Sequence, residues 1–263
     1  MGTPETELVR AVLILALGAP MGSFAALLAD RLPRGRPVAL TRSCCDSCQT
    51  PLRWFELIPI LSWPALRGRC RSCAAPIPAR LWQAELAGLA LAGLALWSGL
   101  GLWGAALFWC LLALILSDLR FYRLPDLLTG SLFALACAAA FWPEGPGGPT
   151  DPARVLQALA GGAVGAGMFW ALARAYRLWR GHDGMGAGDI RLMAGLGAMI
   201  VPLAGWQGLA LVTLIAGLSG LALGLMRALR RGRNLRRRVR LPFGACLGNA
   251  AIFVAAGAAL GLI

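Results

Sequence analysis

Lysine is absent from this chain of 263 residues, and histidine occurs only once. Charged residues make up 14% of the chain, whereas 58% of it is hydrophobic and the mean hydropathy is +0.68. A soluble globular domain carries about a quarter charged residues, so this composition excludes that class. The net charge of +13 comes from arginine alone. We therefore expect an all-α polytopic membrane protein.

Long uncharged runs mark the membrane spans, because a helix of about 20 apolar residues crosses the hydrocarbon. Two runs are too long for one span, so we expect each to fold back as two. Residues 86–117 are broken by the glycines of 98–104, and residues 192–226 turn near Pro202 and Gly205. Single spans are expected at 11–29, 127–143, 155–173 and 241–263. The sequence thus predicts about eight transmembrane helices, the first within residues 1–30 and retained, since no basic segment precedes it.

The arginines set the expected orientation. Of the 25, 23 fall in loops on one side of these spans, and only Arg10 and Arg154 fall on the other. Loops rich in arginine stay in the cytoplasm, so we expect both termini on the outside, together with the Pro/Gly-rich loop at 142–152. The run from Arg227 to Arg240 is expected to anchor this side and contact anionic lipids. Topology explains the positive charge, and we expect no nucleic-acid partner.

The long loop of residues 31–80 carries two cysteine pairs, Cys45-x-x-Cys48 and Cys70-x-x-Cys73. Two such pairs predict a tetrahedral four-thiolate zinc site, each pair supplying two ligands from one tight turn. Disulfides and redox-active thiols are the alternatives, but structural disulfides rarely persist in the cytoplasm. Cys44 is a less suitable ligand than its neighbour because of its longer gap to the next cysteine. Closure around a metal would give this small loop its fold.

Acidic residues are scarce, with 12 in all, and two of them stand at span ends. Asp118 ends the third span, and Asp189 begins the sixth after the glycines of GMGAGD. In the expected topology both lie at the cytoplasmic ends of their spans, as a two-carboxylate protease site requires. The plainer interpretation is that Asp118 marks the membrane boundary beside Arg120, and that Asp189 caps a helix. Asp126 is expected to be an N-cap of the fourth span.

Several motifs, in this order, resemble those of the bacterial prepilin peptidases, which are GxGD-type intramembrane aspartyl proteases. The resemblance covers nearly the whole chain. Its order and spacing are specific, although no single motif is. The motifs are Gly22-Ser23-Phe24, Arg31-Leu32-Pro33, the two CxxC pairs, ELIPILSW at 56–63, RGRC at 67–70, AEL at 84–86, the aspartates of 118–126, GMGAGD at 184–189 and Pro242-Phe243-Gly244.

The resemblance implies a bifunctional enzyme of the bacterial inner membrane, divided into residues 1–30, a zinc-binding module at 31–80 and a seven-helix domain at 81–263. It would cleave the basic leader of type IV prepilins and type II secretion pseudopilins after a glycine. It would then N-methylate the new terminus with S-adenosylmethionine. The site residues that it implies are Asp118 and Asp189 for catalysis, Gly186 and Gly188 in the active-site loop, Cys45, Cys48, Cys70 and Cys73 for zinc, and Glu56, Gly68 and Arg69 as transferase candidates. Ala187 and Ala245 depart from the usual pattern without touching a carboxylate.

Three other interpretations stay open at this point. Gly217-Leu218-Ser219-Gly220 matches the GxSG pattern of rhomboid serine proteases, but the one histidine, His182, lies in a loop. Small residues at 216, 220 and 224 more simply indicate a helix-packing face. His182 with Asp183 could act as a base or a metal ligand, although a loop histidine is usually solvated. A transporter with a zinc-bearing loop is the non-enzyme alternative, but transporters place ionisable groups nearer the middle of the membrane.

Overall fold

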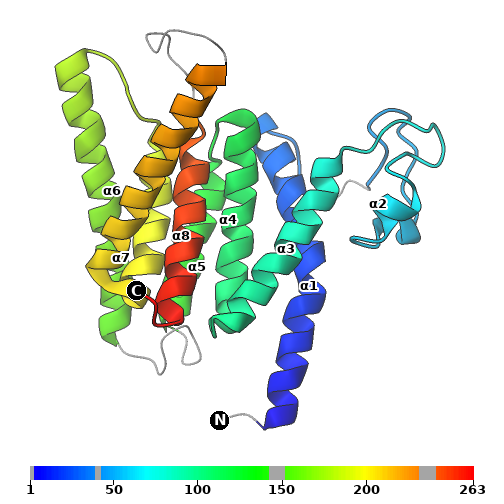
Figure 1. Ribbon diagram of the computed structural model, residues 1–263, viewed down its shortest axis with the longest axis horizontal. Helices are drawn as coiled ribbons and strands as arrows, with labels where there is room; N and C mark the ends of the chain where they lie inside the picture. The colour runs from blue at the N-terminus through cyan, green and yellow to red at the C-terminus, as the bar shows by residue number, and fades with distance from the viewer. Residues whose placement is uncertain (1–2, 39–42, 142–151, 231–240) are drawn as a thin grey trace.

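The computed structural model describes residues 3–38, 43–141, 152–230 and 241–263. Residues 142–151 of the expected outside loop and 231–240 of the arginine run lie outside the described residues. Within the described ranges the regular structure is helical, apart from two isolated β-bridges near the cysteines (Figure 1). The helices are α1 (Pro4–Arg31), η1 (Leu32–Arg34), η2 (Trp54–Leu57), α2 (Ser62–Ala65), α3 (Ala79–Trp97), α4 (Gly101–Phe121), α5 (Asp126–Phe141), α6 (Pro152–Arg180), α7 (Ala187–Arg230) and α8 (Phe243–Ala259).

Glycines divide the two long apolar runs where the sequence predicts. Between α3 and α4 the chain turns through Gly99 and Gly101, whose φ angles of 75° and 58° are easily reached only without a side chain. Gly205, with φ of 63° and ψ of −168°, interrupts α7. The two halves of α7 run in opposite directions on either side of it (Figure 1). Both expected reversals are therefore confirmed.

Four of the described helices are long and apolar enough to cross a membrane: α1, α4, α6 and α7. The apolar helices α5 and α8 are shorter, with 16 and 17 residues. Large apolar side chains also cover outward-facing surfaces, which indicates contact with lipid, since water-facing surfaces rarely expose so many. Examples are Leu13, Leu159, Trp170, Leu218 and Phe253. The chain is therefore an all-helical membrane protein.

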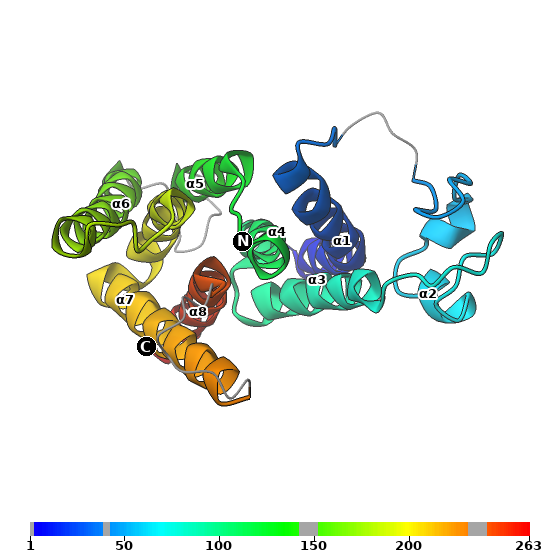
Figure 2. The ribbon, with the colours of Figure 1, turned by 90° about the horizontal axis from the view of Figure 1, so that it is seen from above.

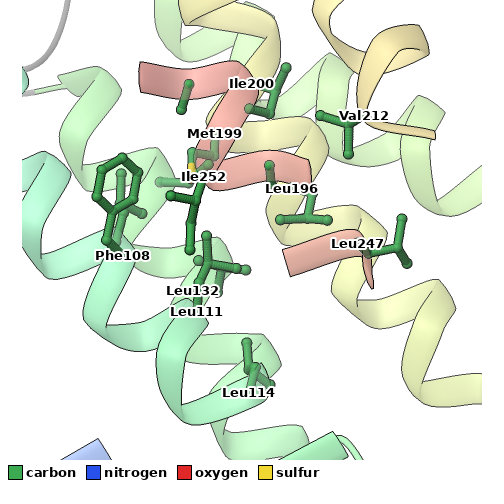
Figure 3. Packing of buried hydrophobic residues seen from close by; sticks show 14 of the residues in the cluster. Phe108, Leu111, Leu114, Leu132, Leu196, Met199, Ile200, Val212, Leu247 and Ile252 are labelled. Carbon is green, nitrogen blue, oxygen red and sulfur yellow. The ribbon is translucent and has the colours of Figure 1, made fainter. Parts of the chain in front are cut away.

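The helices form a row when seen from above (Figure 2). α5, α6 and α7 lie at one side, α8 and α4 in the middle, and α1 with α3 at the other side, beside the cysteine-bearing segment. Side chains of α4, α5, α7 and α8 interlock in the core (Figure 3). Its fully buried members include Leu111, Leu132, Leu196 and Leu247. This packing holds the ends of the four helices in fixed relation.

Glycines allow two pairs of helices to approach closely, as is common in membranes. A Cβ on Gly22 of α1 would lie 2.1 Å from the carbonyl oxygen of Ala84 in α3. A Cβ on Gly197 of α7 would lie 2.0 Å from the carbonyl oxygen of Gly161 in α6. Because these neighbours are backbone atoms, neither crossing leaves room for a side chain.

Residues 43–78 form a small lobe against the start of α3. The indole N–H of Trp82 donates to the carbonyl oxygen of Ile60 at 3.0 Å, and the N–H of Ile60 donates to the carboxylate of Glu85 at 2.7 Å. The rings of Trp63 and Trp82 stack with centroids 5.4 Å apart. The lobe is thus fixed to the helical bundle by hydrogen bonds and by an aromatic contact.

Candidate active site and metal centre

Asp118 lies in the last turn of α4, with only 5% of its surface exposed. Its Oδ2 accepts a hydrogen bond of 2.8 Å from the backbone N–H of Ala245, and the N–H of Gly244 also donates to this carboxylate. Both donors belong to the first turn of α8, where unpaired N–H groups and the helix dipole favour an anion. The Pro242-Phe243-Gly244 motif thus ends at the Asp118 carboxylate.

Arg120 does not serve as the partner of Asp118. Its guanidinium forms an ion pair with Asp30 at the end of α1. Asp118 is thus held by α8 and not by the neighbouring arginine.

Asp189 stands in the first turn of α7 and is half-buried. Its backbone N–H donates to the carbonyl oxygen of Gly186 at 3.1 Å, which closes the glycine turn before the helix. Gly188, the residue before Asp189, packs against Leu124, and Leu124 also contacts Gly244 beside the Asp118 carboxylate. The structure therefore brings together the two carboxylates that the sequence singles out, from helices more than 60 residues apart along the chain.

Leu124, in the turn between α4 and α5, closes the space beside this pair. A Cβ on Gly188 would lie 3.1 Å from the Cβ of Leu124, and one on Gly244 would lie 2.9 Å from its Cδ1. The same position on Gly244 is 3.1 Å from Oδ2 of Asp118. Gly186 is less crowded, because a Cβ there would be 3.8 Å from Oδ2 of Asp189. Both glycines of the loop thus lie beside the pair, in different ways.

Asp126 differs from its prediction. It is the first residue of α5 instead of the residue before it, and its carboxylate forms an ion pair with Arg191 of α7. Its side chain is 72% exposed. The residue ties the start of α5 to the start of α7 at the surface, outside the buried carboxylate pair.

The competing serine and histidine interpretations lack the required contacts. The hydroxyl of Ser219 donates to the carbonyl oxygen of Ala216 at 3.1 Å, within its own helix. Among the described residues, no hydrogen bond joins Ser219 to His182. The exposed ring of His182 lies edge-on to Tyr176 at 5.6 Å. Gly220 faces the ring of Phe243, so the expected helix-packing face is confirmed.

The cysteines that the sequence pairs come together in the lobe. The Sγ atoms of Cys45, Cys48, Cys70 and Cys73 all lie within 4.8 Å of one another. The Sγ atoms of Cys45 and Cys73 are 3.8 Å apart, and those of Cys48 and Cys70 are 4.0 Å apart. Zinc–sulfur bonds of about 2.3 Å in a tetrahedron separate the sulfurs by about 3.8 Å, so this group fits a zinc ion. Cys44 stands outside it, and its thiol donates to Gln49.

The two cysteine turns share one hydrogen-bond pattern, 25 residues apart. The N–H of Cys45 donates to the carbonyl of Thr50, and that of Cys70 donates to Ala75. Gln49 and Ala74, at φ of 56° and 58°, close the turns. The backbone N–H groups of Cys73 and Ser72 lower the pKa of the Cys70 thiol, which favours the thiolate that binds a metal.

The three transferase candidates occupy different positions in the lobe. Glu56 accepts a hydrogen bond of 2.7 Å from the N–H of Arg53 and forms an ion pair with Arg71. Gly68 has φ of 66°, and a Cβ there would lie 2.8 Å from the ring of Trp63. Arg69 forms the isolated β-bridge with Pro76.

Glu85, which the sequence marks only as part of the AEL motif, joins three of the motifs. Its carboxylate accepts hydrogen bonds from the hydroxyl of Ser23 at 3.1 Å and from the N–H of Ile60 at 2.7 Å. These partners belong to the Gly22-Ser23-Phe24 motif and to the segment 56–63. Because a glutamate at the start of a membrane helix also fits an ordinary boundary residue, its spacing alone could not reveal this role.

Comparisons with known proteins show to which family the chain is similar. The family described as the bacterial peptidase A24 N-terminal domain matches residues 16–98, and the type IV leader peptidase family matches residues 105–225. A protein of Burkholderia pseudomallei named prepilin leader peptidase/N-methyltransferase is 38% identical over 248 residues, which cover 93% of this chain and 72% of that protein. Proteins with the same name from Aeromonas hydrophila and Myxococcus xanthus are 38% and 34% identical, and the alignments cover 80% and 85% of this chain and 69% and 64% of theirs. No solved structure matches the chain. The chain belongs to the bacterial prepilin leader peptidase/N-methyltransferase family.

Proposed function

We propose that Asp118 and Asp189 are the catalytic pair with which this prepilin leader peptidase hydrolyses the peptide bond after the leader. The observation that carries the proposal is the convergence of these two carboxylates, from α4 and α7, at one end of the bundle. Their partners differ. Asp118 is held by the amides of α8, whereas Asp189 follows a glycine turn. Family membership supports prepilins as substrates, and we propose type II secretion pseudopilins as a second group.

Two neighbouring carboxylates can share the work of hydrolysis. Like charges at close range disfavour double ionisation, so one group carries a proton while the other does not. The ionised carboxylate takes a proton from water as the water attacks the carbonyl carbon, and the protonated one donates a hydrogen bond to the carbonyl oxygen. The amides of Gly244 and Ala245 fix the orientation of Asp118 during this step. Glycine at 186 and 188 leaves room for an extended peptide beside Asp189.

The same chain methylates the terminus that cleavage exposes. S-adenosylmethionine would supply the methyl group, which would pass from its sulfonium sulfur to the nitrogen of the peptide amine as that amine loses a proton. The protein's part is to bind the donor and to orient an uncharged amine toward it. We assign this part to the side of the molecule that carries the lobe of residues 43–78, where Glu56 and Gly68 lie.

In the membrane, we propose eight spans, with α7 contributing two of them. The start of α1 and the end of α8 lie at the lower end of the bundle in Figure 1, whereas the end of α4 and the start of α7, which carry the two aspartates, lie toward its upper end. The arginine distribution assigns the upper end to the cytoplasm and both termini to the periplasm. Residues 1–30 then form the first span, 31–80 a cytoplasmic module closed by a structural zinc ion on the four cysteines, and 81–263 a seven-helix domain.

Isosteric substitution tests the catalytic pair. We expect Asp118→Asn and Asp189→Asn each to abolish leader cleavage of a purified prepilin, because the amide cannot accept a proton from water. Methylation of a pilin supplied already cleaved should persist. Asp126→Asn is the matched control: it removes a surface carboxylate near the same helix ends, where an exposed ion pair contributes at most about 1 kcal/mol. Cleavage at the wild-type rate by either of the first two variants would refute the assignment.

A further inference from the structure

A cavity of about 650 Å³ lies between the lobe and the helical bundle. Its walls come from the end of α1, both cysteine turns, the segment 56–66 between those turns, the start of α3 and one residue of α4. Cavities of about 300 to 1,000 Å³ are typical of sites for small organic molecules and cofactors. The cavity is separate from the carboxylate pair, since neither Asp118 nor Asp189 lines it.

Arginine is in excess in the cavity wall, and most of it is paired. The carboxylate of Asp30 forms ion pairs with Arg34 and Arg120, and Glu56 pairs with Arg71. In the described part of the chain, the guanidinium groups of Arg36 and Arg80 have no hydrogen bond or ion pair. The wall as a whole has six arginines against four carboxylates, of which Asp46 is one, so positive charge remains that suits the carboxylate of a small ligand.

The wall also offers apolar and acidic groups. Trp63 and Trp82 both line the cavity, and their indole N–H groups are already satisfied by the carbonyls of Ile77 and Ile60. Their rings can therefore contribute only apolar surface and π contact. Glu56 and Glu85 supply negative charge elsewhere in the wall. One cavity thus combines an anion site, an aromatic surface and carboxylates.

We propose that this cavity is where the methyl donor S-adenosylmethionine binds, with Arg36 and Arg80 holding its carboxylate. The donor joins a carboxylate, an ammonium group, a sulfonium cation and an adenine ring in one molecule. The wall has arginines for the carboxylate, tryptophan rings for the adenine, and glutamates for the two cations. The inference rests on the proposed transferase function and gives that function a place. It also explains two of the three transferase candidates: Glu56 lines the wall, and Gly68 makes room for the ring of Trp63.

The cavity is close to the place where cleavage releases the new amine. Arg120 lines the cavity and Asp118 precedes it by two residues in α4. Two residues turn a helix by about 200° and advance it by about 3 Å, so the two side chains leave α4 on opposite sides at nearly the same height. The product of the peptidase site therefore has to pass only around the end of α4 to reach the donor.

Binding of labelled S-adenosylmethionine to the full-length protein in lipid nanodiscs tests the cavity directly. We expect Arg36→Gln and Arg80→Gln each to raise the donor Kd by about tenfold or more, the loss typical of a hydrogen bond to a charged group. Arg36→Lys and Arg80→Lys keep the charge, and their Kd should lie between these values and the wild type. Arg67→Gln is the matched control, because Arg67 is an exposed arginine of the same lobe outside the cavity wall.

Leader cleavage and zinc content, measured on the same preparations, should stay at wild-type values in all five variants, which shows that both parts are folded. Suppose that the wild type binds the donor and methylates pilin, and that the Gln variants bind the donor with the wild-type Kd. The assignment of the donor to this cavity is then refuted, while the transferase function stands. If a Gln variant loses zinc, the Kd of the corresponding Lys variant is the test of that arginine. A Lys variant that binds the donor more weakly than the Gln variant would contradict the role of charge. If the wild type neither binds the donor nor adds a methyl group, the proposed transferase function fails, and this inference with it.

Discussion

The contact between α8 and Asp118 can be tested by adding one methyl group. In Gly244→Ala, the new Cβ would stand 3.1 Å from Oδ2 of Asp118 and 2.9 Å from Cδ1 of Leu124. Both separations are shorter than ordinary van der Waals contact, so the side chains have to shift by a few tenths of an ångström. The carboxylate would move relative to the N–H of Ala245, with which it now forms a bond of 2.8 Å.

The size of the effect follows from that bond. A hydrogen bond to a charged group contributes about 1.5 to 3 kcal/mol, and weakening it misplaces a reacting group. We expect kcat for leader cleavage to fall roughly 10- to 100-fold. KM should change little, because the peptide does not bind through this contact. Alanine is favoured over glycine in helices by up to about 1 kcal/mol, so the melting temperature should not fall in step with activity.

A steady-state assay on a synthetic prepilin peptide, together with thermal unfolding in detergent, separates these effects. Gly130→Ala in α5 is the control, because a Cβ at Gly130 meets nothing within 4 Å. Wild-type kcat in Gly244→Ala would show that the amides of α8 do not orient Asp118. A parallel loss of melting temperature and activity would reduce the contact to a packing role.

Two further predictions concern the lobe. Purified protein should contain about one zinc per chain by elemental analysis, and the double variant Cys45→Ser/Cys48→Ser should lose both the zinc and methylation. Cys44→Ser leaves the four-thiol group intact and should retain zinc. Finding no zinc in the wild type would refute the site. Gly68→Ala should reduce methylation several-fold more than cleavage, because its Cβ would push the ring of Trp63 at 2.8 Å. Gly35→Ala has the same left-handed backbone, with φ of 65° against 66°, and no neighbour within 4 Å, so an equal effect of the two substitutions would point to backbone strain, which costs about 1 to 2 kcal/mol, instead of the tryptophan.

Features that depend on short stretches of chain were predictable. The apolar runs gave the helices, and glycine marked both reversals because a left-handed residue ends a helix locally. The cysteine spacing gave the four-thiol group, including the preference for Cys45 over Cys44. For the carboxylates, the sequence predicted that Asp118 and Asp189 share one end of the bundle, since depth along a span follows from position in the run.

Features that depend on distant partners were not predictable from one sequence. The N–H of Ala245 reaches Asp118 across 127 positions, and Arg120 pairs with Asp30 across 90. Which helix stands beside α4 is decided by packing, and the spans are apolar all round, so their periodicity does not identify a buried face. The sequence places Arg120 beside Asp118 but does not reveal that its ion-pair partner, Asp30, lies on α1. Asp126 was likewise expected to act within its own helix, although it pairs with Arg191.

The sequence also contains a short internal repeat around the cysteine pairs. Residues 43–52 read SCCDSCQTPL and residues 68–77 read GRCRSCAAPI, so the two stretches share both cysteines, the serine between them and the proline. The structure gives both the same closing bonds: the N–H of Leu52 donates to Ser43 at 2.9 Å, and that of Ile77 donates to Gly68 at 2.7 Å. A search for repeats of solenoid length passes over a unit this short. Two equivalent turns, each presenting two sulfurs, together supply all four ligands of a tetrahedral site. The residues in which the repeats differ are therefore the ones free to take another role, and Gly68, which accommodates Trp63, is one of them.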